Sequence, residues 1–435
     1  MRRWDANQSA CVPLRWDPSE AGKGMEWALG LAPLSALGVA GGGVAEEEAE
    51  ARAASPWEPP AAAGFGPAPH GYFTNRQGLQ LAYYAWLPGP RDPPLRACCV
   101  AVHGYGVSVA HEFLRPHARG RPHAAVEGSW VDWFNRRGVA VVAYDHQSHG
   151  HSASAVPGVR CYFERFADLS YDLAQFCADV VPGLLPAGGA GAAHVPVFPL
   201  GMSMGGGVVV DALLRFRNTL GASAPLAVLL SPMLSLERAA NTGANRYLRH
   251  VVSALSRATP TLPVGAKTAN PFYPDLQREF EADPGNYQGL CRARVAHEFL
   301  AFSRTFEKRA RHFDHPFLVI ASKRDVLVDP ESSAMFARAT KTRPEHKRAH
   351  LLDDFCHSLC LEPGNEDIFH LVMAWLDERL PAQPPPLPAP SSSAIPLARP
   401  KTDRAIRYQY QGEHEGNVLG EGRWPAGIAL PPAAG

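Results

Sequence analysis

A serine stands at the centre of the strongest chemical pattern in the sequence. Residues 201–205 read GMSMG, with Ser203 in the middle, and a further glycine follows. The preceding run 195–200, VPVFPL, predicts a buried strand, and the residues from Ser203 to Arg217 predict a helix. A turn between strand and helix exposes the serine hydroxyl, and the helix N-terminus favours a developing negative charge. We therefore predict Ser203 as the nucleophile of an acyl-transfer reaction.

Such a serine needs a general base and a carboxylate that orients the base, in the chain order serine, acid, histidine. Asp325 follows the apolar run 317–321, which predicts a strand late in the sheet, and is the predicted acid. Asp329 is the alternative acid, although Pro330 behind it favours a helix N-cap. His357 comes between an apolar run and the last predicted helix and is the predicted base. His346 and His350 precede that run, and His370 falls within the helix, so these histidines fit the role of base less well.

The tetrahedral intermediate requires two N–H donors, each worth about 3 kcal/mol in the transition state. The residue after the nucleophile, Met204, provides one backbone amide. The segment 103–106, HGYG, follows the apolar run 97–102, and the backbone amide of Tyr105 is the predicted second donor. This chemistry requires no metal and no organic cofactor.

The elements that must position these residues alternate along the chain. Strands are predicted at 97–102, 139–144, 195–200, 226–230 and 317–321, and helices around 130–134, 169–180, 203–217 and 367–380. Such alternation indicates an α/β fold with a mostly parallel sheet and helices on both faces. Pro199 is unusual for a central strand, because it cannot donate to the ladder.

Composition divides the 435 residues into three parts. Residues 1–70 predict a disordered or targeting leader that includes a low-polarity stretch, Trp27–Ala45. Residues 71–381 predict the folded domain, and residues 382–435 a proline-rich disordered tail. Basic and acidic residues balance at 42 each, so neither nucleic acid nor a strongly anionic membrane is expected as the main partner.

The eight cysteines are scattered and show no disulfide framework. A redox or metal pair at Cys356 and Cys360 is disfavoured, because His357 is the one further plausible ligand between them. We expect a reducing compartment, and a cytoplasmic protein that can associate with membranes.

These motifs together resemble the monoglyceride lipase and lysophospholipase branch of the α/β hydrolases, with a serine aminopeptidase S33-like core. The resemblance covers residues 71 to about 380 and includes a loop similar to lysophospholipase-like members from protists. It is carried by HGYG (103–106), Asp145 with HGHS (149–152), SMGG (203–206), Asp325, His357, FTNRQGL (73–79) and DPGNYQG (283–289). Met202, Ser148 and Ser322 depart from the family pattern without removing a catalytic group.

The resemblance implies an α/β-hydrolase fold with a helical cap at about 237–313 that forms an acyl-chain tunnel. It implies the same roles for Ser203, Asp325, His357, Tyr105 and Met204. The implied substrate is a lipid monoester, either a monoacylglycerol or a lysophospholipid, with transient membrane contact through the cap. The alternatives are an acyltransferase, a small-ester esterase or aminopeptidase, and a catalytically silent interaction module.

Three histidines, His111, His117 and His123, recur every six residues after the oxyanion segment. A metal site there is disfavoured, and a solvated insertion is expected. The arginines among them suggest the hypothesis that this basic loop binds a phosphate head group. They are Arg115, Arg119 and Arg121.

Overall fold

The computed structural model describes part of the 435-residue chain. The described residues are 2–3, 66–118, 120–186, 195–217, 220, 226–241, 245–265 and 270–381. Most of the predicted leader, including Trp27–Ala45, and the whole predicted tail lie outside these ranges. No helix within the described ranges is both long and apolar enough to cross a bilayer.

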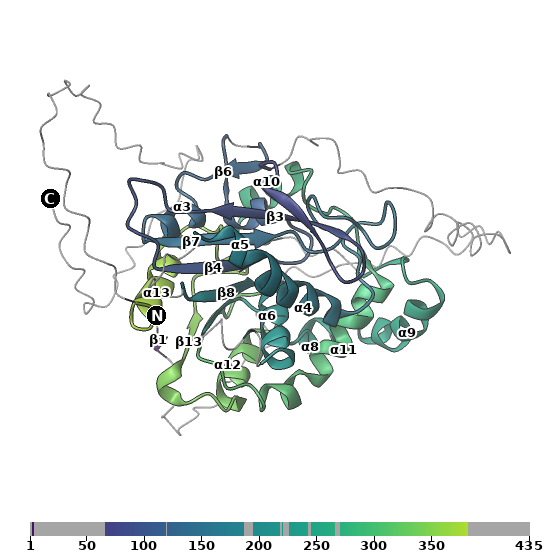
Figure 1. Ribbon diagram of the computed structural model, residues 1–435. Helices are drawn as coiled ribbons and strands as arrows, with labels where there is room; N and C mark the ends of the chain where they lie inside the picture. Colours follow the sequence, from purple (N-terminus) through teal and green to yellow (C-terminus); the bar gives the residue numbers. More distant parts are fainter. Residues whose placement is uncertain are drawn as a thin grey trace, which may run out of the picture. The chain divides into compact units, whose positions relative to one another are not determined.

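A nine-stranded sheet forms the centre of the fold, in the order β1-β13-β12-β9-β8-β4-β7-β3-β2 (Figure 1). Six neighbouring strands run parallel to one another: β13, β12, β9, β8, β4 and β7. The outer strands β1, β2 and β3 are antiparallel to their neighbours. The bounds are β1 Arg2–Arg3, β2 Gly71–Thr74, β3 Gln80–Trp86, β4 Ala97–Val102, β7 Val139–Tyr144, β8 Val197–Met202, β9 Ala227–Leu230, β12 Phe317–Ser322 and β13 Lys347–Leu352. The prediction of a mostly parallel α/β sheet is confirmed.

Helices cover both faces because the central strands bury both faces. In β4, Cys98, Val100 and Val102 belong to one apolar cluster, while the alternate residues Cys99 and Ala101 belong to the other. The first face carries α4 Phe166–Gln175, α6 Met204–Arg215, α11 Ala293–Ala310 and α12 Pro330–Ala339 (Figure 1). The second face carries α2 Val109–Phe113, α3 Trp130–Asn135 and α13 Asn365–Asp377.

The structure interrupts one predicted helix and places Pro199 in a strand, as predicted. The helix expected over 169–180 is interrupted, because a π-helical turn, Phe176–Val180, follows α4 before the short α5, Val181–Leu184. Pro199 does lie within β8, paired with Val100, but the ladder from β8 to β9 begins only at Leu200. The missing N–H of Pro199 therefore precedes the part of β8 that pairs on both sides.

A largely helical insertion separates β9 from β12, where the cap was predicted. It contains α8 Glu237–Asn241, α9 Asn245–Ala258, β10 Pro263–Val264, α10 Pro274–Ala282, β11 Cys291–Arg292 and α11. A second insertion after α2 forms a small hairpin, β5 Arg115–Pro116 with β6 His123–Ala125. A short 3₁₀ turn, Pro344–His346, precedes β13.

Candidate active site

Ser203 occupies a strained turn between β8 and α6. Its backbone is at φ 52° and ψ −118°, a region that residues other than glycine rarely adopt. The turn is held from both sides, because the Ser203 amide donates to the Leu230 carbonyl at 3.0 Å and its carbonyl accepts from Met233 at 2.8 Å. The strain is therefore fixed by β9 and the residues after it, and the serine faces a cavity.

Two glycines make this turn sterically feasible. A Cβ on Gly201 would lie 2.5 Å from the Gly205 carbonyl oxygen, and a Cβ on Gly205 would collide with the Val102 carbonyl. Strand β4, the turn and helix α6 can approach this closely because both positions lack side chains. This is the physical reason for the spacing of the GMSMG motif.

The structure brings the predicted acid, Asp325, and the predicted base, His357, together. The His357 Nδ1 lies 2.7 Å from the Asp325 Oδ2, and both side chains are buried. The other carboxylate oxygen of Asp325 accepts the amides of Leu327 at 2.8 Å and Val328 at 3.0 Å. Asp325 thus has a fixed orientation and can hold the imidazole of His357 in one tautomer.

The alternative acid has a different role. Asp329 is the N-cap of α12, where its side chain accepts the Glu331 amide at 3.3 Å, as its position before Pro330 predicted.

Opposing effects act on the pKa of His357. Burial lowers this pKa, but the adjacent Asp325, through its charge and hydrogen bond, and the charges of Glu112 and Glu362 raise it above the ordinary value of 6.5. A base tuned in this way takes up a proton more readily than a free histidine.

The loop after β4 runs directly beside the nucleophile. A Cβ on Gly104 would lie 3.3 Å from the Ser203 Cβ, and Tyr105 is the next residue of this loop. Within the described residues, the amides of Tyr105 and Met204 donate no hydrogen bond. Both predicted oxyanion donors are therefore free for a substrate oxygen, and Gly104, Tyr105, Ser203 and His357 line one cavity.

His103 fixes the shape of this loop. Its Nε2 accepts the His146 amide at 2.9 Å, so its Nδ1 carries the proton and donates to the Gly104 carbonyl at 2.7 Å. Burial lowers the pKa of His103 to about 4, so the ring stays neutral at physiological pH. This hydrogen bond orients the peptide group that joins Gly104 to Tyr105, and with it the Tyr105 N–H.

Two buried carboxylates near the base were missed by the sequence analysis. Glu112 accepts the Gly104 amide at 3.2 Å and lines the cavity, and burial raises its pKa. Glu362 accepts the amides of Cys356 at 2.6 Å and Ser358 at 2.8 Å, the residues on either side of His357. No pattern in the amino-acid sequence predicts these contacts, because they depend on how the loops pack in the folded chain.

The cavity at Ser203 has a volume of about 630 Å³. Both the core domain and the insertion line it, and most lining side chains from the insertion are apolar. They include Leu236, Val252, Leu276, Phe280, Phe299 and Leu300. This size and character suit an organic ligand with a long apolar part.

The prediction of a solvated histidine loop is wrong for two of its three histidines. His111 and His123 are buried, and their rings stack with centroids 4.4 Å apart, while His117 is exposed. Their burial arises because the hairpin packs against the end of α10, a contact distant in sequence. Cys356 and Cys360 are buried free cysteines, and the described residues contain no group of three or more His, Cys, Asp or Glu side chains that could hold a metal ion. Arg115 and Arg121 are exposed and do not line the cavity, and Arg119 lies outside the described residues.

Solved structures share this fold. The chain is 18% identical to the monoacylglycerol lipase of Paleococcus ferrophilus, covering 68% of this chain and 98% of that one, with a TM-score of 0.51. A soluble variant of the monoglyceride lipase of Saccharomyces cerevisiae, solved with a substrate analogue, is 18% identical. The match covers 75% of this chain and 100% of that one, with a TM-score of 0.57. A carboxyl esterase from Bacillus coagulans is 16% identical, with coverage of 71% of this chain and 97% of that one and a TM-score of 0.52. At these identities the similarity shows the α/β-hydrolase fold.

No curated protein matched the chain significantly. The resemblance to protist members is not addressed by these comparisons and stays a prediction. The family model for serine aminopeptidase S33 matches residues 119–364, more than half of the chain, and spans the elbow at Ser203, Asp325 and His357. The chain therefore belongs to the serine aminopeptidase S33 family, and the molecule is a serine hydrolase of the α/β-hydrolase fold.

Proposed function

We propose that this hydrolase cleaves the fatty-acyl ester of a lipid monoester, and that a monoacylglycerol fits better than a lysophospholipid. The observation that carries the proposal is the cavity of about 630 Å³ that joins Ser203 and His357 to an apolar lining from the insertion. A fatty-acyl chain would be removed from water along this lining, at about 0.8 kcal/mol for each buried methylene.

The charges around the cavity favour an uncharged head group. Among the described residues that line it, none is lysine or arginine, whereas Glu112 and Glu281 are acidic. Asn270, Gln277 and Gln288 add amide groups suited to hydroxyls. A phosphate would lose water beside carboxylates without gaining a cationic partner, which is costly.

The geometry of the site supports the following mechanism. His357 takes the proton of Ser203 as the serine oxygen attacks the ester carbonyl, and Asp325 stabilises the resulting imidazolium. The amides of Tyr105 and Met204 hold the oxyanion. Collapse breaks the ester bond, and His357 returns the proton to the departing glycerol oxygen. Water, activated by His357, then releases the fatty acid and restores Ser203.

Release of fatty acid from a substrate panel tests this proposal. The panel contains a monoacylglycerol, a lysophosphatidylcholine, a triacylglycerol and a short-chain aryl ester. We expect the highest kcat/KM for the monoacylglycerol, and a loss of at least about 10³-fold in Ser203→Ala. Activity confined to the aryl ester would contradict the lipid assignment.

A matched pair of variants tests the predicted acid. Asp325→Asn should lose about 10⁴-fold in kcat, because the imidazole tautomer is no longer fixed. Asp329→Asn, which changes the N-cap of α12, should keep the activity and lose only modest stability. Equal activity of the two variants would rule out Asp325 as the acid.

The alternatives have distinct readouts. An acyltransferase would form a new ester with an added alcohol in place of free fatty acid. An aminopeptidase would release an amino acid from an aryl amide. A silent interaction module would fail to react with a fluorophosphonate probe at Ser203.

A further inference from the structure

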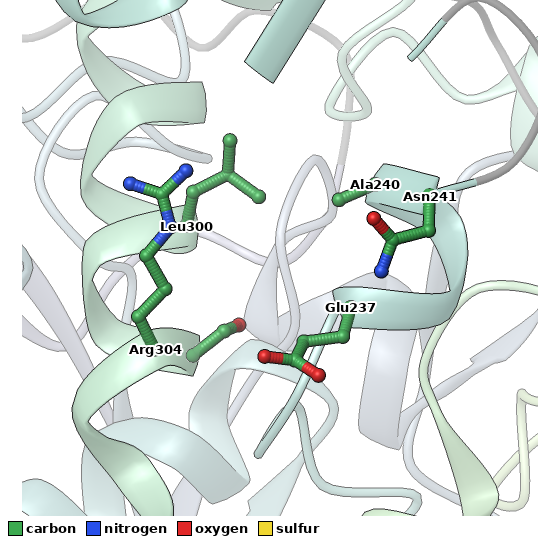
Figure 2. Close-up of a pocket in the computed structure, with 6 residues that line it drawn as sticks. Glu237, Ala240, Asn241, Leu300 and Arg304 are labelled. Atoms are coloured by element: carbon green, nitrogen blue, oxygen red, sulfur yellow. The ribbon is translucent and has the colours of Figure 1, made fainter. Parts of the chain in front are cut away.

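A small slot lies directly behind the large cavity. It measures about 30 Å³ and lies between α8 and α11. Leu300 and Arg304 of α11 extend on one side, and Glu237, Ala240 and Asn241 of α8 on the other (Figure 2). Ala240 and Leu300 line both the slot and the large cavity, whereas the other residues of the slot do not line the cavity. These two side chains therefore form the wall between the two spaces.

The chemistry changes across this wall. On the cavity side the neighbouring lining is apolar, with Leu236, Val252 and Phe299. On the slot side the remaining lining residues, Glu237, Asn241, Ser303 and Arg304, are polar or charged. A hydrocarbon chain gains free energy up to the wall and would meet polar groups beyond it.

We propose that Leu300 and Ala240 form the end wall of the acyl site and set the longest acyl chain that the enzyme accepts well. This inference rests on the proposed function, since it assumes that the acyl chain extends from Ser203 under the insertion. The slot measures about 30 Å³ against about 630 Å³ for the cavity, so it is too small for an acyl chain to enter while Leu300 is present.

Opposite changes at the wall should have opposite effects. Leu300→Ala removes most of the wall and joins the slot to the cavity, so longer chains fit. Each methylene buried in the space that the Leu300 side chain vacates raises kcat/KM up to about fourfold, since a buried methylene is worth about 0.8 kcal/mol. The polar groups of the slot limit any further extension of the chain. Ala240→Leu fills the end of the cavity and should shift the preference to shorter chains.

The experiment measures kcat/KM for aryl esters from butyrate to stearate. We expect the optimum to move to longer esters in Leu300→Ala and to shorter esters in Ala240→Leu. Leu276→Ala is the matched control, because Leu276 lines the cavity from α10 and does not line the slot. It should lower turnover for all chain lengths without moving the optimum. An unchanged optimum in both wall variants would overturn the proposal.

A binding assay separates this inference from the proposed function. Free fatty acids of the same lengths would displace a fluorescent fatty acid from Ser203→Ala, with and without Leu300→Ala. A shift of the best-bound length supports the wall even if the enzyme hydrolyses no lipid ester, in which case only the proposed function fails. If fatty acids bind but their length preference is the same in both proteins, the wall assignment is wrong; if none binds, the acyl site itself is absent.

Discussion

Glu362 stabilises the loop that carries the predicted base. The carboxylate is fully buried and accepts the amides of Cys356 and Ser358, the two neighbours of His357. With both oxygens occupied by N–H donors, the group binds as a carboxylate, and its charge contributes to the raised pKa of His357. Glu362 is thus a positioning residue that acts on the orientation and the basicity of His357.

Glu362→Gln should reduce activity and change its pH dependence. A glutamine accepts one amide but presents an NH₂ group to the other, so the loop loses a charge-assisted hydrogen bond worth about 1.5–3 kcal/mol. His357 acts in its neutral form, so activity rises as the pH passes upward through its pKa. Loss of the negative charge lowers that pKa, and the acid limb of kcat/KM should move to lower pH. The pH–rate profile and a thermal melt measure both effects.

Glu366→Gln is the control for this prediction, because Glu366 is exposed in the first turn of α13. Its pH profile should match that of the wild type. If Glu362→Gln is less stable but has an unshifted acid limb, Glu362 has only a structural role.

The sequence allows the residues of the predicted triad to be proposed but not the carboxylates around them. Ser203 stands in a local motif, and Asp325 and His357 follow recognisable elements in a fixed chain order. Glu112 and Glu362 have no such signal, because their burial and partners depend on loops that pack only in the folded chain.

At the scale of elements, Asp283 joins the hairpin insertion to the end of α10. Its Oδ2 accepts the His123 amide at 3.3 Å and lies 3.5 Å from the His111 Nδ1, and its Oδ1 accepts the Gly285 amide at 2.8 Å. Although burial alone would raise the pKa of Asp283, its contacts with His111 and with these amides lower it. The two insertions are therefore linked through one buried carboxylate, next to cavity-lining His111 and Phe280.

Asp283→Ala should loosen this link. The His123 and Gly285 amides lose their acceptor, which we expect to cost about 1–3 kcal/mol in the free energy of unfolding. Because α10 and α2 both line the cavity, KM should rise more than kcat falls. Urea unfolding and steady-state kinetics measure the two effects.

Asp275→Asn, which removes a partly exposed ion pair with Arg278, is the control and should change stability little. Unchanged stability in Asp283→Ala would contradict the assigned role.

Elements with strong local patterns were predicted closely. The strands at 97–102 and 139–144 have the predicted bounds, because each is a continuous apolar run buried on both faces. The π-helical turn at Phe176–Val180 and the burial of His111 and His123 were not predicted. The burial of the two histidines depends on contacts with Asp283 and Glu279, which are distant in sequence and which hydrophobic periodicity does not encode.

At the scale of the whole molecule, we propose that α9 is the element that contacts membranes. Its sequence, NRYLRHVVSALSRA, contains three arginines and no acidic residue. Tyr247 is 64% exposed and Val251 is 51% exposed, while Val252 is buried and lines the cavity. An amphipathic basic helix with exposed apolar side chains suits the interface of an anionic bilayer.

Vesicle binding tests this contact. The wild type should cosediment with vesicles that contain phosphatidylserine more than with pure phosphatidylcholine vesicles, and the difference should shrink at high salt, because exposed charges are screened within about 10 Å at 0.1 M. Tyr247→Ser combined with Val251→Ser removes the exposed apolar contacts, so it should weaken binding to both vesicles. Neither side chain lines the cavity, so hydrolysis of a dispersed short-chain ester should be unaffected.

Leu87→Ser is the matched control, since Leu87 is 42% exposed and follows β3, outside the insertion. If the double variant binds vesicles as well as the wild type and Leu87→Ser do, α9 is not the docking element, and the enzyme must reach its substrate through another surface.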